Sequence, residues 1–446
     1  MTMIANFRNR TKGFASPRRD SSPVAPLVLL FIPNTPINSN RLCLGVQTAR
    51  QTSLFRIGDL GFIDSVTSTV GYGQYVIIID TVIMLTVLAF FPRGLLGREA
   101  PALEMVQSRL DKVAKFPIPA SLKLLGLFAV LAAFAVYPFL ATPYYTGVGV
   151  LFLINVILVV SYRTITTMGG WSFAHVIMLA LGAYSMALAQ TVFGLSFWLI
   201  LPLSGGVAAL VALVIAYPIM RTRQFYFFLS TFAAGEAIRQ CFIQFKMPFG
   251  GIEGIPFLSP PSALFGISFL NTANYYLVVF VIAVLCVAFL YLFDISRTGR
   301  TVKAMAENEN LSSALGMNTW ALKTLVFCLG AFFAGVAGAL FAGYNGFAAP
   351  TDFTSKFMFK IIVAVIIGGH RTFWGPIVGL IVLTVMQEAL TDADEWVPMI
   401  WGVTIILIVL FVPDSLEGLI QRLWTRASRG QKGTGLKLEG KNASRA

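Results

Sequence analysis

Residues 274–293 read NYYLVVFVIAVLCVAFLYLF and contain no charged side chain. A helix rises about 1.5 Å per residue, so a run of this length extends over about 30 Å, the thickness of the hydrocarbon core of a bilayer. In that layer water cannot pair with the backbone, whereas a helix satisfies its own N–H and C=O groups. The run therefore predicts a transmembrane helix.

Similar apolar runs occur on both sides of this one. Of the 446 residues, 57% are hydrophobic and only 12% are charged, and the mean hydropathy is +0.77, which excludes a soluble globular enzyme. The predicted fold is all-α, a polytopic membrane helix bundle with about ten spans. The candidate spans are 121–140, 144–162, 173–191, 196–220, 225–244, 274–293, 322–343, 357–369, 375–390 and 397–413. The run at 357–369 is short and ends in two glycines, which suggests a broken or re-entrant helix.

Lys and Arg are concentrated in alternate connections between these runs, so those connections and the C-terminus are predicted to be cytoplasmic. The basic connections contain Arg109, Lys112 and Lys115, then Arg163, then Arg221 and Arg223, then Arg297, Arg300 and Lys303, then Arg371, and finally Arg422 through Arg445. The external side then contains Glu253, Asp392, Asp394 and Glu395. This topology explains the net charge of +13, and no nucleic-acid partner is predicted.

The most distinctive polar stretch is 299–318, GRTVKAMAENENLSSALGMN. It is amphipathic and too polar to enter lipid, and Gly316 suits a helix C-terminus because glycine adopts positive φ. By composition alone it would be a solvated linker. The order of its residues, however, resembles the coupling loop of the M-type permease subunit of branched-chain amino acid (Liv-type) ABC importers. In that family a Gly-Arg start, a Glu-Asn-Glu and an Ala-Leu-Gly-hydrophobic-Asn recur in this order.

The resemblance covers about 121–415, because other blocks follow in the family's order. They are GGWSFAH at 169–175 with LGAY at 181–184, RTR at 221–223 with Tyr226, Gly235-Glu236 and Arg239, Gly250-Gly251 with Gly254-Ile255, GVAGAL at 335–340, and Gly368-Gly369 with Trp374-Gly375-Pro376 and Gly379. The departures are Ala174 for a usual Gly, Ile252-Glu253 for Pro-Asn, His370-Arg371 for a small uncharged pair, and Ala306 for Arg. Most departures lie near the expected solute path and external turn, so they affect the identity of the solute more than the class of transporter.

The resemblance implies a domain organisation. Residues 121–415 are expected to form an ABC importer permease domain, with 99–120 as a cytoplasmic linker and 416–446 as a basic cytoplasmic tail. Residues 80–97 end in FPRGLLG and resemble the end of a sibling permease, so 71–98 is interpreted as an extra hydrophobic segment of that origin. Residues 1–70 are predicted to be a basic, irregular and poorly ordered segment.

The same resemblance implies ATP-driven import of a small polar solute, branched-chain or related amino acids, across the bacterial inner membrane. The sequence contains no G-x-x-x-x-G-K-[ST] phosphate loop, so ATP is expected on separate subunits and no cofactor on this chain. The implied partners are a second permease subunit, two ATP-binding subunits and an extracytoplasmic solute-binding protein, within the lipid bilayer. The residues implicated in ATPase coupling are Arg300, Glu307, Asn308, Glu309, Ala314, Leu315, Gly316 and Asn318.

Polar residues inside the apolar runs are the other candidates. Ionisable side chains are costly in lipid, so Glu236 and Arg239, three residues apart, either pair structurally or line the solute path. His175 with Ser172 is a second candidate for the path, and hydrogen bonding within the bundle would also explain His175. The candidate external turn comprises Gly250, Gly251, Glu253 and Gly254. The two histidines are isolated and three of the four cysteines lie in apolar runs, so no metal site and no catalytic residue is predicted.

Small residues recur at every fourth position of the run 322–343. They form two rows, Gly330, Ala334, Gly338, Ala342 and Ala331, Gly335, Ala339, Gly343. Such a face predicts close helix packing or, alternatively, a sliding surface in a bundle that rocks between two states.

Two other functions remain open. A secondary transporter driven by an ion gradient would carry carboxylates at a cavity near the middle of the membrane. The same type of ABC permease could instead carry urea, an amide or an aromatic acid. A membrane enzyme is disfavoured, because the sequence has no cluster of His, Asp or Glu and no nucleophile beside a base.

Overall fold

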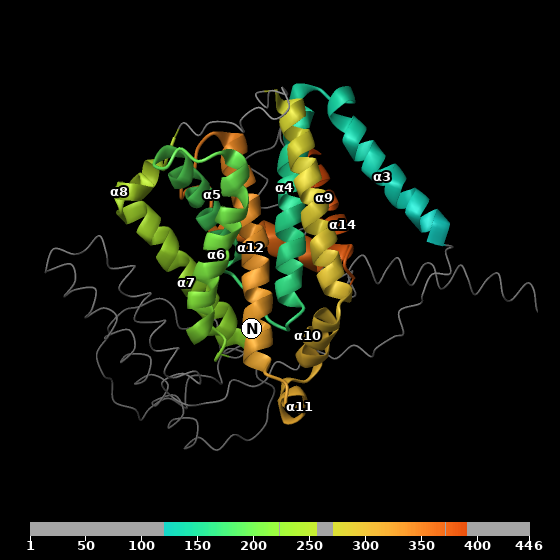
Figure 1. Cartoon of the computed structure of the whole chain (residues 1–446), viewed down its shortest axis with the longest axis vertical. Helices are drawn as coiled ribbons and strands as arrows, with labels where there is room; N and C mark the ends of the chain where they lie inside the picture. Colours follow the sequence, from blue (N-terminus) through green and yellow to red (C-terminus); the bar gives the residue numbers. More distant parts are fainter. Residues whose placement is uncertain (1–119, 223, 257–270, 371, 390–446) are drawn as a thin grey trace, which may run out of the picture. The chain divides into compact units, whose positions relative to one another are not determined.

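A computed structural model of the chain describes residues 120–222, 224–256, 271–370 and 372–389 (Figure 1). They form helices and turns with one isolated antiparallel bridge. The helices are α3 (Ala120–Leu140), α4 (Pro143–Thr166), α5 (His175–Thr191), α6 (Phe197–Ile219), α7 (Gln224–Gln244), α8 (Lys246–Phe249), η2 (Gly251–Glu253), α9 (Thr272–Ile295), α10 (Arg297–Glu307), α11 (Glu309–Ala314), α12 (Thr319–Asn345), α13 (Ser355–Gly368) and α14 (Gly375–Ala389). Several predictions lie outside the described residues: those on 1–70, 71–98, 99–119, 397–413 and 416–446, on Arg223 and Arg371, and on Asp392, Asp394 and Glu395.

The predicted all-α class is confirmed for the described part of the chain. Every candidate span up to 375–390 coincides with a helix to within a few residues. Four of these helices, α4, α6, α9 and α12, are long and apolar enough to cross a membrane, and α5 and α14 are shorter apolar helices. The chain is therefore a multi-pass membrane protein built as a helix bundle.

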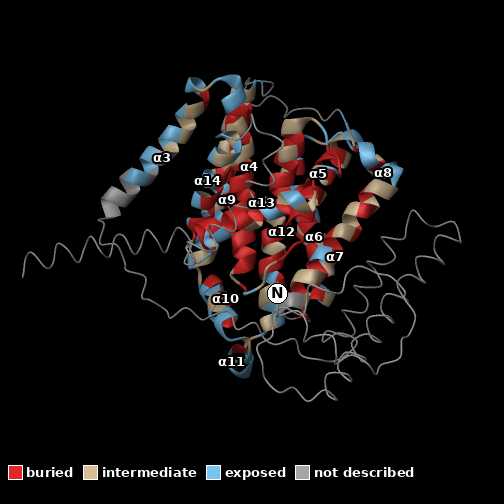
Figure 2. Cartoon of the chain, turned by 180° about the vertical axis from the view of Figure 1, so that it is seen from behind, coloured by how far each residue is buried: buried red, intermediate tan, exposed pale blue. Residues whose placement is uncertain are grey.

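Helix α12 lies at the centre of the bundle and packs against α4, α5 and α6 (Figure 1). Within the 18-residue apolar stretch of each helix, 83% of the residues are buried in α4 and 72% in α12. The share is only 33% in both α6 and α9. Figure 2 shows the same contrast, with buried residues concentrated on α4, α5 and α12. The outer faces of α6 and α9 expose apolar side chains such as Leu210, Val214 and Leu285, as expected for a surface that contacts lipid.

The small residues of α12 bring its backbone against its neighbours, which confirms the prediction of close packing. A Cβ atom at Gly182 of α5 would collide with the backbone of Gly335, and one at Gly338 would collide with the carbonyl oxygen of Leu179. Residues with side chains would force these helices apart, so the interface depends on glycine. The sliding role of this face remains a prediction.

Helices α13 and α14 form a close pair that lies against α4. The backbones of Gly368 and Gly375 are in contact, and Gly379 lies against the carbonyl oxygen of Ala364. With 14 residues, α13 is about 21 Å long, which is short for a perpendicular crossing. It ends at Gly368, and the residue that caps it, Gly369, has a φ of 93°. A broken helix is consistent with these bounds, and its re-entrant course remains a prediction.

The structure corrects the prediction for Arg163, which the charge pattern placed in a cytoplasmic connection. Helix α4 continues to Thr166, so Arg163 lies in its last turn, and its side chain is only 1% exposed. Its Nη1 atom lies 2.8 Å from Oδ1 of Asp294. The prediction was wrong because the carboxylate that compensates this buried charge comes from α9, far away in the sequence.

Candidate functional site

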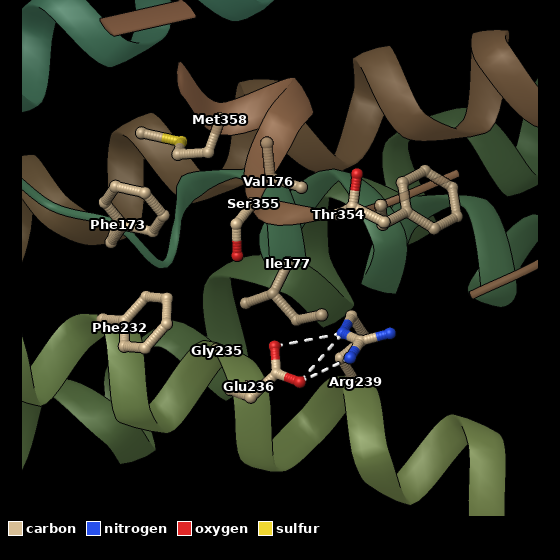
Figure 3. A pocket seen from close by; sticks show the side chains of 11 residues that line it. Phe173, Val176, Ile177, Phe232, Gly235, Glu236, Arg239, Thr354, Ser355 and Met358 are labelled. Atoms are coloured by element: carbon tan, nitrogen blue, oxygen red, sulfur yellow. Dashed lines mark hydrogen bonds and ion pairs between the residues drawn. The ribbon is translucent and has the colours of Figure 1, made fainter. Parts of the chain in front are cut away.

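A partly open cleft, whose empty space of about 290 Å³ includes open solvent, lies between α7, the beginning of α5 and the beginning of α13 (Figure 3). Its lining residues are Phe173, Val176, Ile177, Phe232, Gly235, Glu236, Arg239, Phe353, Thr354, Ser355 and Met358. In Figure 3 Glu236 and Arg239 extend from α7 on one side, and Thr354 and Ser355 lie across from them. Helix α7 makes few contacts with the rest of the bundle, which leaves room for this cleft.

The charged wall of the cleft is an ion pair on one helix. Arg239 Nε lies 3.0 Å from Oε2 of Glu236, and Gln240 donates from Nε2 to Oε1 of the same carboxylate at 3.0 Å. The side chains of Arg239 and Glu236 keep 20% and 25% of their surface exposed. The predicted pairing is thus present, and both charges still reach the cleft, so the two interpretations from the sequence are compatible.

Another part of the cleft lining is apolar and aromatic. Phe173 contacts Phe228 and Phe232 of α7 and Phe359 of α13 edge to face, with ring centroids 5.2–5.3 Å apart. The backbone N–H of Phe173 donates to Thr231 Oγ1 at 2.9 Å, which ties the segment before α5 to α7. A solute in this cleft would therefore meet charge on one side and hydrocarbon on the other.

Ser172 and His175 lie apart from the cleft, because both are fully buried and neither belongs to its lining. His175 Nε2 lies 3.0 Å from Ser161 Oγ and 3.1 Å from the carbonyl oxygen of Leu158, both on α4. Ser172 Oγ accepts from the backbone N–H of Ala174 at 3.3 Å. The contacts of His175 join α4 to the start of α5, and the contact of Ser172 is local to the segment before α5.

The predicted coupling loop forms two helices, α10 and α11, at one end of the bundle (Figure 1). Gly299, Val302 and Met305 of α10 are buried against the bundle. Leu311 of α11 and Leu315, which directly follows α11, are 57% and 73% exposed. We call the segment formed by α10, α11 and the turn to α12 (297–318) the coupling segment. Among the predicted contact residues, Arg300, Glu307, Asn308, Ala314, Leu315, Gly316 and Asn318 are exposed, and Glu309 is half-exposed.

Asparagines set the two breaks in the coupling segment. Asn308 Oδ1 accepts from the backbone N–H of Leu311 at 2.9 Å and caps α11, and Asn318 Oδ1 accepts from Ala321 at 3.0 Å and caps α12. Gly316 has φ of 82°, so the turn between them uses a conformation that favours glycine. Glu309 pairs with Lys323 of α12 at 2.7 Å. These two asparagines thus have a local structural role that the motif alone did not reveal.

The predicted external turn follows the C-terminal end of α7 and lies next to the connection between α12 and α13. Gly250 and Gly254 have positive φ, and a Cβ at Gly254 would collide with the backbone of Ala348. Ile255 and Ala348 exchange backbone hydrogen bonds of 2.9 and 3.0 Å. Glu253 is exposed. The turn is therefore fixed to the segment that leads to Thr354 and Ser355 in the cleft.

Comparison with known proteins places the chain among transport proteins. The model of a family described as the branched-chain amino acid transport system permease component matches residues 144–412. The chain belongs to this family. The permease is 29% identical to LivM of Escherichia coli K12, named a permease protein of a high-affinity branched-chain amino acid transport system, over 69% of its own length and 79% of that protein.

Two further relatives agree with this assignment. LivM of Salmonella typhimurium is 28% identical over 66% of the permease and 74% of its own length. LivH of the same organism is 33% identical, but over only 28% of the permease and 40% of its own length. No solved structure matches the permease. The resemblance to the M-type subunit is confirmed, and the protein is a membrane permease, not an enzyme.

Sequence reasoning identified only part of the cleft of this permease. Glu236 and Arg239 were selected because charge is costly in lipid, but Phe232, Thr354 and Ser355 were not. The aromatic residue is ordinary in an apolar run, and the two hydroxyl residues precede the apolar run 357–369, in what reads as a connection. The one available signal was the short length of the eighth apolar run, which indicated that the chain leaves helical structure near the cleft.

Proposed function

We propose that the permease imports branched-chain or related amino acids across the bacterial inner membrane, driven by ATP that separate subunits hydrolyse. The complete importer would contain a second permease subunit, two ATP-binding subunits and an extracytoplasmic solute-binding protein. The family match and the names of the relatives LivM and LivH support this proposal. In this proposal the permease binds no cofactor, and ATP stays on the partner subunits.

The observation that carries the proposal is the exposed surface of the coupling segment. Leu311 and Leu315 are exposed beside polar residues at the end of the bundle, on two short helices that are too polar for lipid. An amphipathic helix of this kind docks into a groove of a partner by its apolar residues. An ATPase that closes on nucleotide binding can then move the coupling segment and the helices attached to it.

This contact is tested by Leu315→Asp in the full importer. Burying a carboxylate in an ATPase groove is unfavourable, so we expect the variant to insert normally but to lose copurification of the ATPase subunits and at least tenfold in uptake. Phe193→Asp is the matched control, because it exchanges an exposed apolar side chain in the connection between α5 and α6, outside the coupling segment. Normal ATPase binding and uptake in Leu315→Asp would contradict the proposal. Uptake by the permease without ATPase subunits would do the same and favour an ion-driven transporter.

We further propose that the cleft lies on the solute path and receives a zwitterion. Glu236 would accept hydrogen bonds from an ammonium group, and Arg239 would donate to a carboxylate. Helix α13 begins at the cleft wall with Thr354 and Ser355, and a helix N-terminus also favours anions. The aromatic wall with Phe173 and Phe232 suits an apolar side chain. This combination favours amino acids over neutral solutes such as urea.

The solute contact is tested by Glu236→Gln and Arg239→Gln, measured as uptake of leucine and of its amide in proteoliposomes. A hydrogen bond to a charged group is worth about 1.5–3 kcal/mol, so we expect the apparent KM for leucine to rise about 10- to 150-fold. Because leucinamide lacks the carboxylate, its uptake should respond less to Arg239→Gln than to Glu236→Gln. Cys241→Ser on the same helix is the control and should change neither KM. Equal behaviour of all variants would exclude the cleft from the path.

A further inference from the structure

The carboxylate of Asp294, in the last turn of α9, joins two cations from different parts of the bundle. Its Oδ1 atom lies 2.8 Å from Arg163 Nη1 on α4, and its Oδ2 atom lies 2.8 Å from Lys303 Nζ on α10. Lys303 Nζ also lies 3.3 Å from the backbone carbonyl oxygen of Asp294. The Asp294 side chain is 13% exposed and Arg163 is almost completely buried. The coupling segment is thus tied to α9 and α4 through one carboxylate.

Arg163 extends this connection to the α13–α14 pair. Its Nε atom donates to the carbonyl oxygen of Thr372 at 2.9 Å, and its guanidinium lies 5.3 Å from the centre of the Phe373 ring. Both residues belong to the connection between α13 and α14. Helix α13 begins in the cleft with Ser355, so an unbroken series of contacts runs from α10 through Asp294 and Arg163 to the helix pair that forms part of the cleft wall.

The apolar contacts of α10 do not make the same connection. Its buried residues are Gly299, Val302 and Met305, and α10 packs chiefly against α9 with a smaller contact to α12. Charge-assisted hydrogen bonds are directional, and so they transmit a displacement between the groups that they join better than a loose apolar contact does. The ion pairs of Asp294 therefore give the coupling segment a direct link to α4 and the α13–α14 connection, in addition to the packing of Ala306 beside Gly169 in the turn after α4.

We propose that Asp294 is a positioning residue that transmits movement of the coupling segment to α4 and to the α13–α14 pair. This inference rests on the proposed function, because it assigns a role to the contact between the coupling segment and the ATPase. Asp294 does not belong to the lining of the cleft, and in the proposed function nucleotide binds to separate subunits. Its loss should therefore separate ATP hydrolysis from transport while both ends of the importer stay intact.

The experiment uses the full importer in proteoliposomes and measures leucine uptake, ATP hydrolysis and copurification of the ATPase subunits for each variant. For Asp294→Asn we expect normal copurification, basal ATP hydrolysis within about twofold of the parent, and a fall of at least tenfold in leucine transported per ATP. Lys303→Met should change the same ratio in the same direction. Arg221→Met is the control, because it removes an exposed cation from the connection between α6 and α7, outside the coupling segment, and should leave the ratio unchanged.

Two combinations make the test specific to this connection. The double variant Asp294→Asn/Lys303→Met should lose no more transport per ATP than Asp294→Asn alone. The single variant Lys303→Arg keeps the charge and should therefore keep the transport per ATP of the parent. Lys303→Met also tests the inference if Asp294→Asn fails to fold, since Lys303 is 39% exposed and its loss leaves Arg163 paired with Asp294.

Normal transport per ATP in Lys303→Met, or in folded Asp294→Asn, would overturn the inference, and so would an equal loss in Arg221→Met. If Leu315→Asp nevertheless abolishes ATPase binding, the proposed function survives and only the role of Asp294 is wrong. If Leu315→Asp also behaves as the parent, the proposed coupling itself is wrong.

Discussion

Two interfaces of the permease are formed by different kinds of residue. Where α12 meets α5 and α6, glycine and alanine bring backbones into contact. Where α10 meets the end of the bundle, charged side chains add to the buried Val302 and Met305, with Asp294 between Arg163 and Lys303. Helices in lipid thus gain stability from close contact. The water-facing end can use charge pairs, and loss of one partner then leaves the neighbouring charge uncompensated.

The two designs also differ in how they respond to movement. Backbone contact tolerates little change of distance, because a small separation already forfeits much of the dispersion energy. Charge pairs keep most of their attraction over the same separation, since Coulomb energy falls only as the inverse of distance. The centre of the bundle is therefore suited to hold its shape, and its charged end is suited to be displaced. Four substitutions test this comparison.

The largest loss of stability is expected for Arg163→Met. Breaking a buried ion pair costs about 3–5 kcal/mol, and we expect about 3 kcal/mol because Lys303 still compensates Asp294. Unfolding of the purified permease in mixed micelles measures the loss. Arg221→Met, which removes an exposed cation, should cost less than about 1 kcal/mol. Equal losses in the two variants would show that burial of Arg163 is not what matters.

Gly338→Ala should destabilise the central interface by about 2 kcal/mol, because the added Cβ meets the backbone of Leu179 and forces α5 and α12 apart. The same unfolding measurement applies. Gly206→Ala on α6 is the control, since its Cβ has no atom within 4 Å and alanine favours a helix. A Gly338→Ala variant as stable as Gly206→Ala would mean that the contact between α5 and α12 is looser than described.

A smaller effect is expected for Tyr275→Phe. The Tyr275 hydroxyl of α9 donates to the carbonyl oxygen of Leu340 on α12 at 2.7 Å, and loss of a neutral hydrogen bond costs about 1 kcal/mol. Tyr291→Phe on the same helix removes an exposed hydroxyl and should change the free energy of unfolding very little. A loss well above that of one hydrogen bond would indicate that the α9–α12 contact resembles the central interface more than the charged end.

The smallest effect is expected for Lys323→Met, which removes the partner of Glu309. The two atoms lie 2.7 Å apart, but Glu309 is 39% exposed, so water and salt screen the pair and the cost should be about 0.2–1 kcal/mol. Measurements at low salt and at about 1 M salt should bring variant and parent closer together at high salt. A loss as large as that of Arg163→Met, independent of salt, would contradict the distinction between buried and exposed charge pairs.

Much of the fold could be predicted from the sequence, and the reason is visible in α9 and α12. A helix in lipid must be apolar along its whole length, so an apolar run of consecutive residues shows where it begins and ends. The small residues of α12 likewise repeat with the period of a helix, and this predicted its close packing. Arg163 was misplaced for the converse reason: its burial depends on Asp294, and nothing beside Arg163 in the sequence reports that partner.

The sequence alone is enough to recognise the permease as a helical membrane protein of the branched-chain amino acid permease family. It also shows that 299–318 is a polar segment between two apolar helices. These properties depend on composition and on short-range order along the chain. Only the tertiary structure decided that Glu236 and Arg239 face Ser355 across a cleft, and that Asp294 joins α10 to α4. Such contacts depend on how the helices pack, because side chains distant in sequence meet only when close packing has set the position and rotation of each helix.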